Sequence, residues 1–201
     1  MALRPIITLP DNMLRQKSEP VSKVDGAIRT VLDDMIETMY DAPGIGLAGV
    51  QVGVMQRLIV LDTARKDEEP QPLFMVNPEI VSLSEEHMIY EEGCLSIPDY
   101  YEDVERPERV RVRFRDRDGA ECEMEAEGLL AIAIQHEIDH LEGVLFIDHI
   151  SRLKRERVVK KFAKAARLAQ DEGRAYDPRS EPREPRGMGA RKPPRPAEPV
   201  A

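Results

Sequence analysis

The sequence contains little cysteine and no long apolar run. Two cysteines in 201 residues, Cys94 and Cys122, do not make a disulfide framework, so we expect a protein of the reducing cytoplasm. No apolar stretch approaches the roughly 18 residues needed to span a bilayer, and we therefore expect no membrane partner. The first twelve residues, MALRPIITLPDN, lack the apolar segment and cleavage site of a signal peptide.

Positive charge is scarce in most of the chain and concentrated at its end. Residues 1–150 carry 14 Lys and Arg against 31 Asp and Glu, a net charge of −17, whereas residues 151–201 have a net charge of +8. An acidic body disfavours nonspecific binding to nucleic acid, so we expect no DNA partner. The basic end can still supply a local electrostatic contact.

The basic end divides into two parts. Residues 151–170 are predicted to form a helix, because an apolar stripe recurs at helical spacing, at Val159, Phe162, Ala166 and Ala169. From Gly173 onward the chain is rich in Pro, Arg, Glu and Gly and has almost nothing to bury, so residues 173–201 are predicted to be disordered. The remaining length suits one domain, residues 1–172, that includes the basic helix.

Hydrophobic periodicity predicts the first elements. Apolar residues at three- and four-residue steps from Ile28 to Met39 indicate a helix with one buried face, with Asp25 as its N-cap. The segment APG at 42–44 ends it, because the residue before a proline leaves the helical region. The branched apolar runs at 57–62 and 73–83 are predicted strands joined by a polar loop.

Strict alternation predicts a hairpin further along the chain. RVRVRFR (109–115) and AECEMEAE (120–127) flank the turn DRDG. Opposite charges across the outer faces, Arg on one strand and Glu on the other, favour one register. The inner faces are expected to point into the core, Val110, Val112 and Phe114 on one strand together with Ala120, Cys122 and Met124 on the other. We interpret Cys122 as a core residue, against the alternative of a chemical role.

The segment HEIDH (136–140) lies in a predicted buried helix, 128–143. Its spacing puts His136 and His140 one turn apart on the same helix face, which suits a divalent metal. Glu137 is the residue type that serves as general base in H-E-x-x-H hydrolases. The alternative is a pair of histidines satisfied inside a core.

A catalytic metal site of this kind needs a third protein ligand. Metzincin proteases place a third histidine beyond the glycine that follows H-E-x-x-H, but this chain has Phe146 at that position. His149 comes too late for that pattern, and His87 lies in a polar stretch before a strand. Both are expected to be exposed or to lie behind the ligands.

Cys94 is the better candidate for the third ligand. It lies in EEGCLSIP, where Gly93 and Pro98 bracket a rigid segment. One thiolate and two imidazoles suit zinc, and the thiolate also suits ferrous iron. Without the histidines, a buried structural thiol would be an equal interpretation.

Three segments together carry a family resemblance. GIGLAGVQVG (44–53), EGCLSIP (92–98) and QHEIDHLEGVLF (135–146) resemble, in order and spacing, the motifs of peptide deformylase. The resemblance implies an α+β fold of mixed, mainly antiparallel strands around the buried metal-binding helix, with a C-terminal helix. It implies hydrolysis of the formyl group of N-formylmethionyl nascent peptides. It also implies Fe²⁺ as the metal, with Zn²⁺, Ni²⁺ or Co²⁺ as substitutes.

The resemblance also implies roles for single residues. It makes Cys94, His136 and His140 the metal ligands and Glu137 the catalytic acid and base. It assigns the formyl oxygen to Gln51 and the backbone N–H of Leu95. It implies that Gly44, Ile45 and Gly46 pair with the substrate backbone. It implies that Leu129, Ile132 and Ala133 form the methionine pocket.

One departure from the family pattern lies next to these residues. Gly49 stands where the family usually has alanine, and Val50 where it often has proline. The departure loosens the backbone before Gln51 and bears on the placement of that residue.

Two other function classes remain open from the residues alone. The H-E-x-x-H pattern by itself is typical of a metal endopeptidase. A binding protein of the ribosome or RNA, with a structural metal, would use the basic helix at 151–170. The helix either packs on the domain through its apolar stripe with a solvated basic face, or it contacts the ribosome, and the resemblance favours the ribosome contact.

GIGLAG, residues 44–49, has the glycine spacing of a dinucleotide-binding loop. A helix precedes it and a strand comes after it, whereas a dinucleotide-binding loop has a strand before it and a helix after it.

Overall fold

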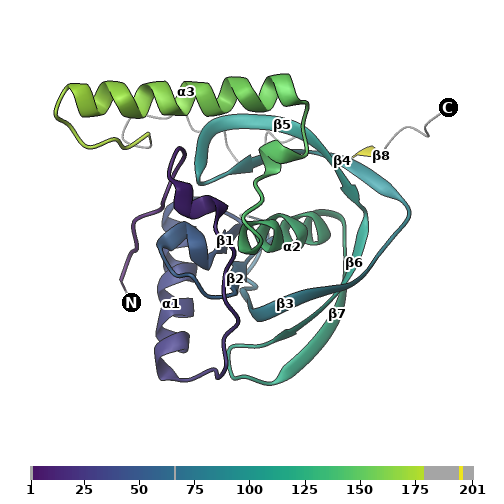
Figure 1. Ribbon diagram of the computed structural model, residues 1–201. Helices are drawn as coiled ribbons and strands as arrows, with labels where there is room; N and C mark the ends of the chain where they lie inside the picture. The colour runs from purple at the N-terminus through teal and green to yellow at the C-terminus, as the bar shows by residue number, and fades with distance from the viewer. Residues whose placement is uncertain (1, 66, 179–194, 197–201) are drawn as a thin grey trace.

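The computed structural model describes residues 2–65, 67–178 and 195–196. Figure 1 shows a helix, α2, at the centre of the molecule, with strands curving around it. The elements in chain order are η1 (Asn12–Arg15), α1 (Gly26–Asp41), β1 (Gly46–Ala48), η2 (Gly49–Val52), β2 (Leu58–Leu61), β3 (Leu73–Leu83), β4 (His87–Cys94), β5 (Ile97–Pro107), β6 (Arg109–Arg115), β7 (Glu121–Glu127), α2 (Gly128–Leu141), η3 (Phe146–Asp148), α3 (Arg152–Asp171) and β8 (Arg195–Pro196).

A five-stranded antiparallel sheet has the order β1-β2-β3-β6-β7. Its strand β2 is buried on both faces, because Leu58 and Val60 pack in the cluster that includes α1 while Ile59 and Leu61 pack in the cluster that includes α2. A strand covered on both faces has no need of polar alternation, which explains the unbroken apolar run. The α+β fold predicted from the sequence is confirmed.

A second sheet packs against α2 through β4. Strands β4 and β5 form a long antiparallel hairpin, and β8 pairs with β4 at Met88 and Ile89. The register of β4 and β5 shifts between Gly93 and Cys94, where the chain turns from one strand to the other. Cys94 therefore lies at the end of a sheet that faces α2.

The predicted first helix and the predicted hairpin are confirmed. Asp25 caps α1, since its side chain accepts hydrogen bonds of 3.0 Å from the backbone N–H groups of Ala27 and Ile28. Strands β6 and β7 pair Arg with Glu at each outward position from Arg109 opposite Glu127 onward. Cys122 is partly buried against the core cluster, as interpreted from the alternation.

Two details of the predicted core are wrong. Ala120 is exposed, because it belongs to the turn, where its backbone N–H donates to the Asp116 side chain at 2.9 Å. In α3 the buried residue is Val158 and not Val159, which is 37% exposed, so the inward face includes Val158, Phe162 and Ala169. The docking of α3 on the N-terminal segment and β5 sets this helical phase.

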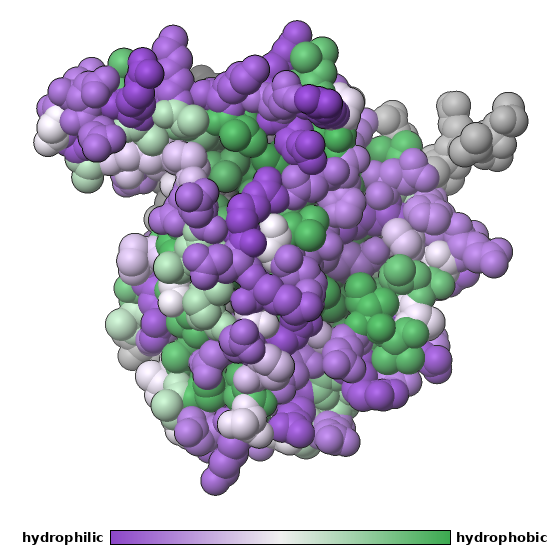
Figure 2. All heavy atoms as spheres, in the orientation of Figure 1, coloured by the Kyte–Doolittle hydropathy of each residue, from purple (hydrophilic) through white to green (hydrophobic). Residues whose placement is uncertain are grey.

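The C-terminal segment is only partly within the described residues. Tyr176 is partly buried against the cluster under α3. The predicted disorder of 173–201 mostly concerns residues 179–194 and 197–201, which lie outside the described part. Within the described part, no helix has the length and apolar character needed to cross a membrane. Figure 2 shows mostly hydrophilic side chains over α3.

Candidate metal centre

Helix α2 carries two of the predicted ligands into the interior. His136 and His140 are 8% and 1% exposed, and their ring centroids lie 5.1 Å apart. Cys94 reaches them from the end of β4, and the ligand atoms of the three residues all lie within 4.8 Å of one another. The structure therefore brings a thiol together with two imidazoles that lie far from it in the sequence.

Hydrogen bonds direct the ring nitrogens of the two histidines. His136 Nδ1 lies 2.8 Å from Glu92 Oε2, and His140 Nε2 lies 3.2 Å from Cys94 Sγ. Burial alone would raise the pKa of Glu92, but hydrogen bonds from His136 and Arg106 outweigh it and lower that pKa to about 2. An ionised carboxylate only accepts, so the Nδ1 of His136 carries the proton and its Nε2 is left as a potential ligand atom.

The electrostatics of the cluster suit a cation. Burial lowers the pKa of His136, but hydrogen bonds with Cys94 and Glu92 outweigh burial and hold that pKa well above its ordinary value. Burial and the neighbouring His136 lower the pKa of His140 well below its ordinary value, which keeps a lone pair on its ring. Among the described residues, His140 Nδ1 and Glu137 Oε2 are buried without a hydrogen-bond partner. The donor set and its surroundings fit a divalent metal.

Glu137 lies next to the triad and is almost fully buried. Its side chain is surrounded closely enough that burial raises its pKa to about 7. Gly46 makes this placement possible, because a Cβ at that position would lie 2.9 Å from Glu137 Cδ. Gly44 has the same relation to Leu95, whose Cδ1 would lie 2.8 Å from an added Cβ. The two glycines thus let the segment 44–46 approach the side chains of Leu95 and Glu137 closely.

Gln51 is held in one orientation beside Cys94. Its Oε1 accepts a 2.8 Å hydrogen bond from the Ala48 N–H, and its Nε2 donates to Ser96 Oγ at 3.0 Å and to Cys94 Sγ at 3.5 Å. The amide N–H₂ therefore points toward the cluster. Gly49, the departure from the family pattern, is required by packing, since a Cβ there would lie 2.8 Å from the Val54 carbonyl oxygen.

The predicted pocket residues do not all lie in one cluster. Ile132 packs with Leu129 and with Met88 and Tyr90 of β4, whereas Ala133 belongs to the main core together with the partly buried Ile45. Met88 and Tyr90 were not predicted from the sequence. In the structure they alternate with the exposed His87 and the half-buried Ile89, but Ile89 is itself apolar, so the sequence shows no alternation at this point.

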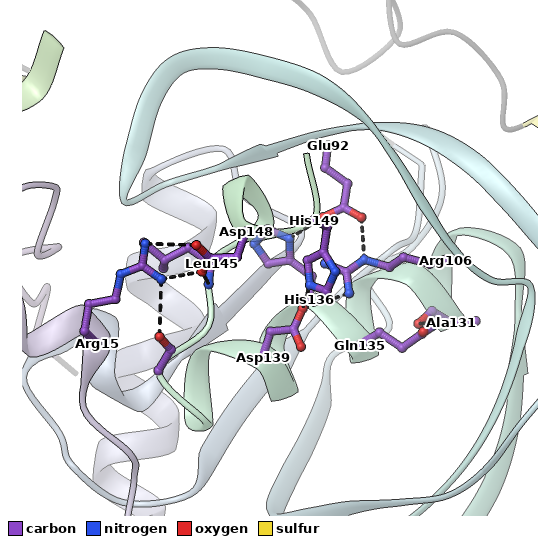
Figure 3. A network of polar contacts seen from close by, with 11 residues as sticks. Arg15, Glu92, Arg106, Ala131, Gln135, His136, Asp139, Leu145, Asp148 and His149 are labelled. Carbon is purple, nitrogen blue, oxygen red and sulfur yellow. Dashed lines mark hydrogen bonds and ion pairs between the residues drawn. The ribbon is translucent and has the colours of Figure 1, made fainter. Parts of the chain in front are cut away.

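A chain of charged side chains lies behind His136 (Figure 3). Arg106 donates to both oxygens of Glu92, at 2.5 and 3.1 Å, and its third nitrogen donates to Asp139 Oδ2 at 2.8 Å. The same Asp139 oxygen lies 2.8 Å from His149 Nε2. His149 thus lies behind the ligands, as expected, while His87 is exposed and contacts the Glu85 carbonyl.

This arrangement can be compared with known proteins. A sequence model of the polypeptide deformylase family matches residues 3–156. The chain belongs to the peptide deformylase family. A relative described as peptide deformylase, from Nitrobacter hamburgensis, is 64% identical over 173 residues, which cover 84% of this chain and 99% of the relative. A relative from Rhizobium meliloti is 60% identical over 83% of this chain and 96% of its own length.

Solved structures of peptide deformylases have the same fold. The enzyme of Ehrlichia chaffeensis in complex with actinonin is 41% identical, with a TM-score of 0.77 over 86% of this chain and 99% of its own. The enzyme of Legionella pneumophila is 46% identical, with a TM-score of 0.75 over 84% of this chain and 98% of its own. As a family member, the chain is a metal-dependent hydrolase that removes the formyl group from the N-terminal formylmethionine of newly synthesised proteins.

Proposed function

We propose that Cys94, His136 and His140 hold one Fe²⁺ ion, for which Zn²⁺, Ni²⁺ or Co²⁺ can substitute. The mutual distances within 4.8 Å, the burial of both histidines and the neutral state favoured for His140 support this assignment. A metal held there would supply Lewis acidity and would bring the pKa of a bound water close to neutral. Three protein ligands are the set typical of catalytic rather than structural sites.

Glu137 is the acid and base of the proposed mechanism. It accepts the proton of the attacking water and delivers it to the departing amine, which a carboxyl with a pKa near 7 can do in both directions. Gln51 Nε2 and the Leu95 N–H stabilise the charge that develops on the formyl oxygen. The fixed orientation of the Gln51 amide, through Ala48 and Ser96, supports this role.

The edge of β1 is the proposed place for the substrate backbone. β1 is the outer strand of its sheet, and the Asp62 N–H donates to the Ile45 carbonyl at 2.9 Å. Because neighbouring residues of a strand face opposite sides, Gly46 turns its backbone groups away from β2, whereas the Gly44 N–H, before the strand, donates to the Met39 carbonyl at 2.9 Å. An extended peptide can pair at Gly46, while its methionine side chain contacts Leu129 and Ile132, which pack together, and the neighbouring Ala133 of α2.

The test of these roles separates binding from chemistry. Glu137→Gln should keep its metal and lose about 10²- to 10⁴-fold in kcat on a formyl-Met peptide, the range typical of general acid–base catalysis. Cys94→Ala should lose the metal itself in elemental analysis after anaerobic purification. A Cys94→Ala enzyme with full metal and normal turnover would refute the ligand assignment. Hydrolysis of blocked internal peptides would instead favour the endopeptidase.

A ribosome contact through α3 is the second part of the proposal. The exposed side chains of Arg157, Lys160, Lys164 and Arg167 follow one helix face at three- and four-residue steps, and none has an ion pair among the described residues. Such a stripe suits RNA phosphates in the cytoplasm, where nascent chains emerge. Reversing the charge of Lys160 and Lys164 should weaken cosedimentation with ribosomes and reduce its salt dependence. Equal binding by the variant would exclude this face.

Residues 1–172 are proposed as the complete hydrolase domain, and 173–201 as a tail that the reaction does not need. The Nitrobacter relative supports this division, because its whole length corresponds to 84% of this chain. Truncation after residue 178, which retains the packed Tyr176, should leave kcat/KM on short formyl-Met peptides unchanged. A large loss of kcat/KM in the truncated protein would show that the reaction needs the tail.

A further inference from the structure

The charged chain behind His136 extends to the molecular surface. It starts at His136 Nδ1, passes through Glu92, Arg106 and Asp139, and ends at His149, whose side chain is 35% exposed. Each link is 3.1 Å or shorter. The proposed reaction uses only the inner end of this chain, and the outer end has no role in it.

We propose that His149 is a positioning residue for His136, and this rests on the proposed role of His136 as a metal ligand. The ring of His149 holds the Asp139 carboxylate against Arg106. Arg106 in turn fixes both oxygens of Glu92, and Glu92 fixes the tautomer and orientation of the His136 ring. Loss of the direct partner of a metal ligand, here Glu92, typically lowers metal affinity by about 10- to 100-fold, and His149 acts on that partner through Asp139 and Arg106.

The position of Asp139 explains why its outer partner matters. Its Oδ2 accepts from Arg106 and His149 at 2.8 Å each, and its side chain is 23% exposed. Without His149, this carboxylate has one partner on the protein and water on the other side, and it can rotate toward solvent. Arg106, only 4% exposed, would then keep its hydrogen bonds to Glu92 but lose the contact of its third nitrogen with the Asp139 carboxylate.

A purely structural role for His149 is the competing explanation. His149 comes directly after η3, so the contact with Asp139 also anchors that turn to α2. A second anchor of the same turn allows the two roles to be separated. Arg15 contacts Asp148 and the Gly143 carbonyl, and Figure 3 shows this cluster apart from the chain that reaches His136. Arg15→Leu is therefore a matched control that loosens the same turn.

The experiment measures metal loss from the metal-loaded enzyme in excess chelator, with thermal unfolding recorded in parallel. His149→Leu should release metal about 10-fold faster than the parent, the lower end of the range for partners behind a metal ligand. His149→Gln, which returns an N–H donor near the position of Nε2, should restore most of the difference. Arg15→Leu should release metal at the parent rate, even where its unfolding temperature falls as far.

The Nδ1–H signal of His136 in the metal-free protein gives a second readout. Its exchange with water should quicken in His149→Leu and stay unchanged in Arg15→Leu. Unchanged metal release in His149→Leu, or equal acceleration in both leucine variants, would overturn the positioning role. His136→Ala separates this failure from that of the proposed function, since an alanine variant that retains metal would refute the ligand set itself.

Discussion

The interior behind His136 and the outer face of the β6–β7 hairpin use the same ion pair in opposite surroundings. Arg106 and Glu92 are 4% and 3% exposed and are joined by two hydrogen bonds, whereas Arg113 and Glu123 are 58% and 40% exposed and meet at 3.3 Å. The chemistry of the two pairs is identical. Their environments make one a fixed part of the metal centre and the other a solvated contact.

Burial changes what the loss of one partner means. In the interior, removal of an arginine leaves a carboxylate that water cannot reach, and the missing solvation is a large unfavourable free energy. On the hairpin, water takes the place of the lost partner at once. The free energy of an Arg–Glu pair is therefore set by its surroundings, and the two regions give a direct comparison within one chain.

Loss of the interior arginine should have the largest effect. Arg106→Leu leaves the buried Glu92 with His136 as its remaining partner and without the arginine charge, which should reduce the free energy of unfolding by about 3–5 kcal/mol and disturb metal binding. Arg106→Lys keeps the charge but not the two-pronged contact, and should fall between this variant and the parent. Denaturant unfolding measures both. A decrease in the free energy of unfolding below about 1 kcal/mol in Arg106→Leu would show that burial does not make this pair differ from the exposed one.

The lack of spare volume in the interior can be tested without changing any charge. Gly46→Ala forces a Cβ against the Glu137 carboxylate, and a displacement near 1 Å can reduce turnover by about 10²-fold. Gly26→Ala is the matched control at the surface, because the added Cβ meets nothing within 4 Å outside its own helical turn. Steady-state kinetics on a formyl-Met peptide compare the two variants. Equal activity would show that Glu137 moves freely.

The smallest effect is expected on the hairpin. Arg113→Ala should change the free energy of unfolding by no more than about 0.5 kcal/mol, and the change should shrink further in high salt. Unfolding in low and high salt is the measurement. A loss comparable to that of Arg106→Leu would mean that the outer ladder contributes as a network and that exposure does not decide the outcome.

The sequence predicted local features well because their signals are local. The cap at Asp25, the alternation of the hairpin and the buried helix with His136 and His140 can be inferred from spacing alone. Cys94 could be inferred as the third ligand from its residue type and its rigid segment, but nothing in EGCLSIP states which helix it will face. The structure brings these three residues within reach of one another.

Features that depend on distant contacts were missed. Arg106 lies in a strand whose sequence, IPDYYEDVERP, alternates poorly, and its partners are 14 and 33 residues away. No spacing rule indicates that such an arginine is buried. In α3 the predicted Phe162 and Ala169 are buried, but Val158 is buried in place of the predicted Val159, because the docking partners of a basic helix decide where a weak apolar stripe turns inward.

The junction of β7 and α2 has a consequence for how this enzyme can vary. Strand β7 ends at Glu127 and α2 begins at Gly128, whose φ of 58° turns the chain without any intervening loop. Each residue added to a helix rotates the rest of that helix by about 100°. One inserted residue at this junction would swing His136 and His140 away from Cys94, so we expect the length of the chain here to be fixed, whereas the turn at 116–120 can lengthen without moving the metal centre.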